Sequence, residues 1–258
     1  HTLRPTTLLV AAVLTFPVVS MGCDLADAVE ADPLLHVLTT HHPTPVDGAF
    51  PDRGPAEHPR TFQNDQGWNI SLTEAYITTT NVSLVDCAGA QRGLDMYWGP
   101  CADDVIDNED VIDQITVAGR TIPEGRYCEM LFEYGPYYVA DGENSSSAHP
   151  RPPSKIEGVT IFLKGRAEKG DATETFEWSS AGSRVVNLGL DSIEPDGSPL
   201  RVSAADSFPT DLTVGKAYDG FFVGVDFANV DQQTIEDSLM DILEDETRVV
   251  LGRSMTTY

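Results

Sequence analysis

The residues best suited to chemistry are histidines gathered in one part of the chain. Of the six histidines, four lie between residues 36 and 58, namely His36, His41, His42 and His58. Neutral imidazole is a good ligand for copper and zinc. If this stretch folds back on a sheet, the four side chains could converge on one metal ion. The alternative is a polar linker with incidental histidines, because no rigid element frames their spacing.

The stretch that carries these histidines has the composition of a tether. Residues 23–60 are rich in proline, aspartate and histidine, and most of the stretch lacks helical or strand periodicity. We expect a tether or His-containing arm there, followed by one folded domain at 61–258.

The first 22 residues have the layout of a secretory signal peptide. Arg4 precedes an apolar run from Leu8 to Val19, and small residues follow before Cys23. Gly22-Cys23 resembles the lipobox of bacterial lipoproteins, whose cysteine is lipidated. We expect an exported protein with a lipid anchor at Cys23, on the outer membrane or a periplasm-facing membrane of a bacterium. Ordinary cleavage near this point is the alternative.

The net charge of the chain limits the classes of partner that it can bind. The formal net charge is -25, and such a surface repels phosphate backbones, so we expect no nucleic-acid partner. It favours solubility and cations. The acidic run at 102–114 lacks the ligand order of an EF-hand loop, and a solvated charged face is the alternative to a cation site there.

The cysteines other than Cys23 are Cys87, Cys101 and Cys128. In an oxidising compartment the simplest outcome is one disulfide and one thiol. A Cys87–Cys101 bond, which closes a short loop, is favoured over Cys101–Cys128, but spacing does not settle the connectivity.

The clearest strand follows a turn at Pro123 and Gly125. Alternation predicts that one face of it packs against a core, and that face carries Cys128, Met130, Phe132 and Tyr134.

Further strands are expected on both sides of this one. We expect them at 68–80, 82–86, 158–164, 173–178, 184–190 and 218–227. Residues 230–246 have apolar positions at helical offsets and predict one amphipathic helix, and 247–251 either extends it or forms a closing strand. The fold class is therefore all-β, an antiparallel β-sandwich of the Ig-like, Greek-key kind with a C-terminal helix.

Two loops carry aromatic residues beside Gly-Pro. Tyr97 and Trp98 lie in one, and Tyr137 and Tyr138 follow the Gly-Pro of the other. Exposed, these rings would bind a protein or glycan partner, whereas buried rings would cap the end of a sandwich.

Catalytic signatures are missing from the sequence. It has no Gly-x-Ser-x-Gly elbow, no phosphate-binding glycine loop and no His-Glu-x-x-His motif. We expect a protein that is not an enzyme.

One family shares a short pattern with this chain. The spacing Gly125-x-Tyr127-x-x-Met130-x-Phe132-x-x-Gly135-Pro136 resembles a strand of MbnP-like proteins, which are periplasmic or surface proteins associated with copper handling. The resemblance implies a β-sandwich that binds copper through histidine, often beside a partner haem protein. The histidines of the family lie in or beside its strands, whereas 62–258 contains only His149 here, so the arm histidines would have to serve.

Two functions from different classes follow. The first is a membrane-anchored secreted lipoprotein that binds a metal ion, copper first, without catalysis. The second is a tethered β-sandwich module that binds a protein or glycan through its aromatic Gly-Pro loops.

Overall fold

The computed structural model describes residues 32–46, 59–97, 99–106, 115–138, 152–206 and 209–253. The chain divides into two compact units, His1–Ala31 and Asp32–Tyr258, and all described residues belong to the second. The signal peptide and Cys23 therefore lie outside the described residues. Within them the chain forms fourteen strands, one α-helix and two short 3-10 helices. None of these helices is long and apolar enough to cross a membrane.

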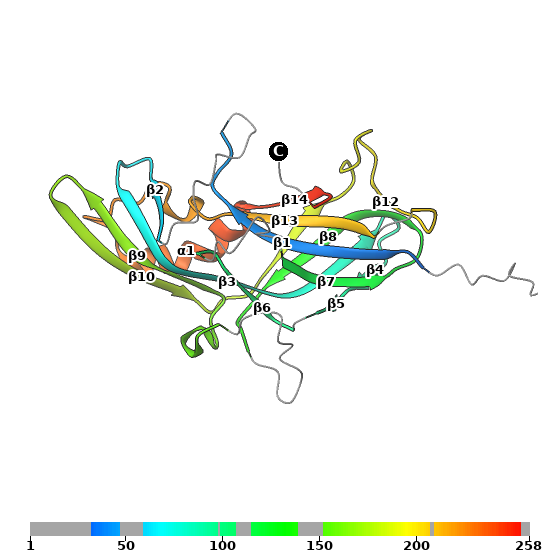
Figure 1. The fold of residues 1–258 in the computed structure, drawn as a ribbon, viewed down its shortest axis with the longest axis horizontal. Coiled ribbons are helices and arrows are strands. Elements are labelled where there is room, and N and C mark those ends of the chain that lie inside the picture. The colour runs from blue at the N-terminus through cyan, green and yellow to red at the C-terminus, as the bar shows by residue number, and fades with distance from the viewer. Residues whose placement is uncertain are drawn as a thin grey trace, which may run out of the picture. The chain divides into compact units, whose positions relative to one another are not determined.

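One layer of the fold is a five-stranded sheet. Its order is β14-β13-β1-β7-β5, formed by β14 (Thr247–Leu251), β13 (Thr210–Ala217), β1 (Leu34–His42), β7 (Ile115–Thr121) and β5 (Asp95–Met96). Strand β1 runs antiparallel to β7 but parallel to β13. Figure 1 shows β1 in blue and β13 in orange side by side, although they come from opposite ends of the second unit. This parallel pair departs from the purely antiparallel sandwich that the sequence predicts.

The second layer is organised around β3 (Asn69–Asp86). Its main path is β10-β9-β3-β8-β11, formed with β10 (Ala172–Ser180), β9 (Ile161–Lys169), β8 (Gly125–Tyr134) and β11 (Arg184–Gly189). Four short strands complete this sheet, namely β2 (Arg60–Gln63), β4 (Gln91–Gly93), β6 (Cys101–Asp104) and β12 (Leu200–Val202). Strands β2, β6 and β4 pair with successive parts of β3, and β12 pairs with β8.

Strand β3 joins two segments that the sequence predicts as separate strands. Register shifts at Leu72/Glu74 and at Thr79/Asn81 bend the ladder without ending it. Such irregularities let one long strand serve two neighbours, and β3 pairs with β9 along its first half and with β8 along its second.

Strand β8 confirms most of the predicted core face. Met130, Phe132 and Tyr134 are buried, but Cys128 is only half-buried and Tyr127 is buried instead. The pairing of β8 with β3 shifts register between Asp86 and the residue before it, so Cys128 is opposite no residue of β3 in this pairing. An extra residue in one strand reverses the inside-outside phase, which alternation alone cannot reveal.

Helix α1 (Gln232–Asp245) confirms the predicted C-terminal helix. The Asp231 carboxylate accepts a hydrogen bond from Thr234 N and caps its first turn. Leu239, Met240 and Leu243 are its buried residues. After the helix the chain turns directly into β14, so the closing strand is the correct alternative for 247–251.

The predicted strand at 218–227 is wrong. The structure has a 3-10 helix, η3 (Gly220–Phe222), followed by turns in which Gly224 has a φ of 76°. This left-handed conformation ends any extended segment and favours glycine. The aromatic residues of this segment are buried by a different path, because Phe222 and Phe227 both pack against Trp178.

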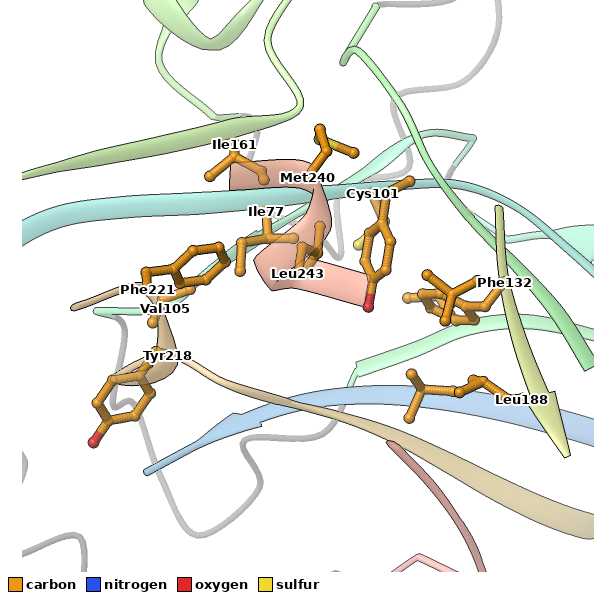
Figure 2. Packing of buried hydrophobic residues seen from close by; sticks show 14 of the residues in the cluster. Ile77, Cys101, Val105, Phe132, Ile161, Leu188, Tyr218, Phe221, Met240 and Leu243 are labelled. Carbon is orange, nitrogen blue, oxygen red and sulfur yellow. The ribbon is translucent and has the colours of Figure 1, made fainter. Parts of the chain in front are cut away.

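The core lies between the two sheets and beneath α1. Figure 2 shows Ile77 of β3 beside Leu243 of the helix and Phe221 of η3, with Phe132 of β8 further along the same cluster, near Leu188. Leu35 and Val37 of β1 are fully buried in the same cluster. The fold is thus an all-β sandwich with one helix.

The described part of the predicted arm is structured. Its residues 34–42 form β1, a central strand of the five-stranded sheet, so the prediction of a loosely packed tether is wrong there. The error arises because β1 is buried on both faces and mixes histidine and threonine with leucine and valine, so it shows no alternation.

The disulfide also differs from the prediction. Cys87 is bonded to Cys128, with Cα atoms 4.9 Å apart, and Cys101 is a buried thiol outside this bond. Cys87 follows directly on β3, and its N–H donates to Arg126 O of β8 at 3.1 Å. Cys101 instead pairs with Thr79, further back along β3, so neither Cys87–Cys101 nor Cys101–Cys128 can form.

Candidate functional site

Strand β1 separates the histidines that the sequence places together. Successive side chains of a strand point to opposite faces, so His36 and His42 share one face and His41 lies on the other. His41 points into the sandwich beside Lys216, its partner in β13. The structure therefore does not bring His36, His41 and His42 to one point. His58, the fourth predicted ligand, lies outside the described residues.

His36 is held by a carboxylate on the outer face of the five-stranded sheet. Its Nδ1 lies 3.3 Å from Asp211 Oδ1, and the side chains are 18% and 15% exposed. The Asp211 carboxylate in turn accepts from Arg253 Nε at 2.7 Å. Within the described residues His36 Nδ1 has no hydrogen-bond partner, so the contact with Asp211 is an ion-pair distance and not a hydrogen bond. A carboxylate beside one ring nitrogen favours one orientation of an imidazole, as in many metal sites. We call His36, Asp211, Arg253 and Tyr97 the His36 site.

Tyr97 stands against His36 across a glycine. The two ring centroids are 6.1 Å apart in an edge-to-face arrangement. Gly119 is the β7 residue opposite His36, and a Cβ on it would lie 2.1 Å from Tyr97 Oη and 2.9 Å from His36 Cδ2. The missing side chain of Gly119 thus makes the space in which phenol and imidazole meet. Burial, and then the charge of Asp95, raises the pKa of Tyr97.

His41 belongs instead to a buried ionic network between the two sheets. Asp103 of β6 lies at its centre, with Oδ1 3.5 Å from His41 Nδ1 and Oδ2 2.8 Å from Lys216 Nζ. Arg60 Nη2 is 3.0 Å from His41 Nε2, and Arg60 Nε donates to Val105 O at 3.0 Å. Lys216 Nζ also donates to Thr39 Oγ1. All five of these side chains are buried.

Burial and charge shift the pKa values of this network in opposite senses. Burial lowers the pKa of His41 below 6.5, although the Asp103 charge opposes the shift. Burial alone would raise the pKa of Asp103, but Lys216 and His41 hold it well below its usual range. Burial and the nearby Asp103 charge raise the pKa of the Cys101 thiol to about 12. The network therefore contains an ionised carboxylate and a neutral imidazole at neutral pH.

The remaining predicted metal ligand in the described residues is His42. It is fully buried, and its Nδ1 lies 2.9 Å from Pro43 O. Across the ranges that the structure describes, no group of three or more His, Cys, Asp or Glu side chains could hold a metal ion. A metal at the His36 site would therefore need donors of another kind, such as the Tyr97 hydroxyl or water, beside the His36 imidazole.

The predicted partner-binding tyrosines differ in exposure. Tyr97 is 43% exposed and Tyr138 is 58% exposed. Tyr137 is half-buried and packs against a small cluster that contains Ile156 and Phe162. Trp98 lies outside the described residues.

The sequence reasoning missed the ionic network and the partner of His36. Asp103 stands in an acidic run that reads as a solvated face, and Arg60 lies at the edge of the expected tether. Lys216 gave the one available signal of the network. It follows Leu212 and Val214 at alternate positions of one strand, and those two residues face the core, so the lysine is expected to face it too.

Comparison with known proteins gives a distant similarity of fold. No family model and no curated protein matches the chain. Among solved structures, MbnP from Methylosinus trichosporium aligns with a TM-score of 0.44 and 11% identity, over 85% of this chain and 98% of that one. The similarity is weak and concerns the fold alone, so nothing about the site follows from it.

Proposed function

We propose that this chain is an exported, lipid-anchored protein that binds a metal ion, copper first, without catalysing a reaction, and that His36 is its principal ligand. The observation that carries the proposal is the Asp211–His36 contact, with Tyr97 beside the ring. A carboxylate at Nδ1 leaves the other ring nitrogen for a metal, and phenol oxygen is a second donor. The partial exposure of His36 gives an ion a way in.

Two further features support the compartment and the ligand class. The Cys87–Cys128 disulfide is typical of proteins in an oxidising compartment. The net charge of -25 raises the concentration of cations near the surface.

The anchor is proposed from the Gly22-Cys23 pattern behind the apolar run. Replacing Cys23 with alanine should move the protein from the membrane fraction to the soluble periplasmic fraction. If the variant stays with the membrane, the anchor at Cys23 is wrong.

The metal proposal is tested by copper titration of the purified protein with calorimetry and electron paramagnetic resonance. Wild type should bind one ion with nitrogen coupling, and His36→Ala should lose both. Tyr97→Phe should weaken binding, whereas Tyr138→Phe, a matched change at another exposed tyrosine, should not. Binding that survives in His36→Ala but not in His58→Ala would keep the function and refute this site. Binding in neither wild type nor variant would refute the function.

A second candidate function is a module that binds a protein or glycan partner, including a haem protein. The exposure of Tyr97 and Tyr138 favours it, because exposed tyrosines are common binding residues. Loss of partner capture in the double Tyr97→Ala, Tyr138→Ala variant, with metal binding absent, would select this function.

A further inference from the structure

Lys216 and Asp103 form a contact that joins the two layers of the sandwich. Lys216 belongs to β13 of the five-stranded sheet, and Asp103 belongs to β6, which pairs with β3 of the other sheet. Lys216 is 0% exposed and Asp103 3%. Their Nζ and Oδ2 atoms are 2.8 Å apart. Yet within the described residues neither Asp103 Oδ2 nor His41 Nδ1 has a hydrogen-bond partner, so the angles of these contacts are not those of hydrogen bonds.

We propose that Lys216 and Asp103 condense into an intramolecular amide, a covalent bond from Lys216 Nζ to Asp103 Cγ that ties β13 to β6. The 2.8 Å contact between Lys216 Nζ and Asp103 Oδ2 holds the amine beside the carboxyl group with which it would react. Holding both groups in a fixed contact replaces an encounter between molecules with a step inside one molecule.

The step balances without an oxidant, a reductant or a cofactor. The ammonium and the carboxylate together carry three protons, all on nitrogen. The Nζ–Cγ bond forms and one Cγ–O bond breaks. One proton stays on the amide nitrogen, and the other two leave on the departing oxygen as water.

His41 lies beside the oxygen that leaves in this step. Its Nδ1 lies 3.5 Å from Asp103 Oδ1, the oxygen that Lys216 does not contact. The Arg60 guanidinium at Nε2 can only donate, so Nε2 accepts and the proton of the neutral ring resides on Nδ1. That N–H faces the oxygen that must leave and stabilises negative charge on it, while both protons of the departing water come from the Lys216 ammonium.

The surroundings favour the amide over the ion pair. The titratable group that faces the pair from β1 is His41, a neutral imidazole that Arg60 of β2 contacts on its far side, while Cys101 and Tyr134 contribute uncharged side chains. Two charges buried between sheets carry a desolvation cost, which a neutral amide removes. Exclusion of bulk water also disfavours hydrolysis of the product. Unlike the Cys87–Cys128 bond, which lies within one sheet, this link would join both sheets and resist reductants.

The experiment is peptide mapping of the purified wild-type protein after reduction, alkylation and trypsin digestion. The amide predicts a branched species of peptide 93–120 and peptide 202–248, uncleaved at Lys216 and lighter than their sum by one water. Separate peptides of full mass would show an ion pair only and overturn the proposal. Water lost from peptide 93–120 alone would indicate a cyclic imide, which also overturns it.

Two variants distinguish formation of the amide from folding of the protein. Lys216→Arg keeps the positive charge but cannot give this amide, so its peptides should stay separate. Asp103→Asn keeps the shape and offers ammonia as the leaving group, so a branched species should be lighter by one ammonia instead of one water. The wild-type map decides the proposal even if both variants fold poorly.

Discussion

Arg60 Nη2 lies 3.0 Å from His41 Nε2, and the guanidinium and imidazole that make this contact could both carry positive charge. The guanidinium remains charged at any ordinary pH, so the contact is favourable only while the imidazole is neutral. Asp103 lies on the other side of the ring, with its Oδ1 3.5 Å from His41 Nδ1. The histidine is therefore a neutral bridge between a cation and an anion.

The first prediction is a loss of stability in mild acid that depends on His41. Because burial lowers its pKa in the folded state, the unfolded state binds the proton first as the pH falls below 6.5. The His41 contribution is thus present above that pH and decreases below it, by up to about 1.4 kcal/mol per pH unit. Urea unfolding of wild type and His41→Gln between pH 7 and pH 5 measures this, since glutamine accepts from Arg60 but does not titrate there. Equal slopes for both proteins would contradict it.

The second prediction concerns the carboxylate behind His36. Asp211→Asn keeps the shape of the side chain but removes its charge, and we expect copper affinity to fall about 10–100-fold, as for other partners of metal-bound histidines. Isothermal titration at one pH measures the change. Asp206→Asn, a change at an exposed aspartate outside the site, serves as the control. Unchanged affinity in Asp211→Asn would show that the carboxylate does not support a ligand.

The third prediction ranks three glycine substitutions in strands by thermal unfolding. A Cβ on Gly165 would lie 2.3 Å from the main-chain oxygen of Ser71, whereas on Gly119 it would meet the mobile end of Tyr97, and on Gly93 nothing within 4 Å. Overpacking against main chain costs about 1–3 kcal/mol or more. Gly165→Ala should therefore destabilise most, Gly119→Ala less, and Gly93→Ala least. A Gly119→Ala protein as unstable as Gly165→Ala would mean that Tyr97 cannot move aside.

The fourth prediction concerns the disulfide. The bond joins residues 41 apart in sequence, and the loop-closure model gives it about 4 kcal/mol of stability. The double variant Cys87→Ala, Cys128→Ala should therefore unfold at markedly lower denaturant concentration. Cys101→Ala, which leaves the bond intact, is the comparison. A double variant as stable as wild type would show that the closed loop adds nothing.

The sequence predicts well those elements whose periodicity is local. Helix α1 and strand β11 appear where the pattern places them, because each buries one face. Strand β1 could not be recognised from the sequence. Both of its faces are buried along most of its length, so its residues show no alternation between apolar and polar types. The segment at 218–227 shows the opposite failure, in which an apolar, aromatic run forms a 3-10 helix and turns and not a strand.

The site was harder to predict than the fold. The sequence identifies His36 and Tyr97 as residues of interest, but their meeting depends on Gly119, a residue with no side chain to notice. Asp103 and Lys216 are far apart in sequence and meet only because the two sheets stack. Such contacts between layers leave no periodic trace in one sequence.

The pairing of β1 with β13 also determines when the molecule can fold. Residue 35 is opposite residue 210, so β1 acquires both of its neighbours only after β13 has been synthesised. Contacts of such high sequence separation form slowly, because a large loop must close first. Until then Leu35 and Val37 have no sandwich interior to enter, and the nascent chain stays open. An open chain is what a translocation channel for unfolded polypeptides requires, so this topology suits the export that we propose.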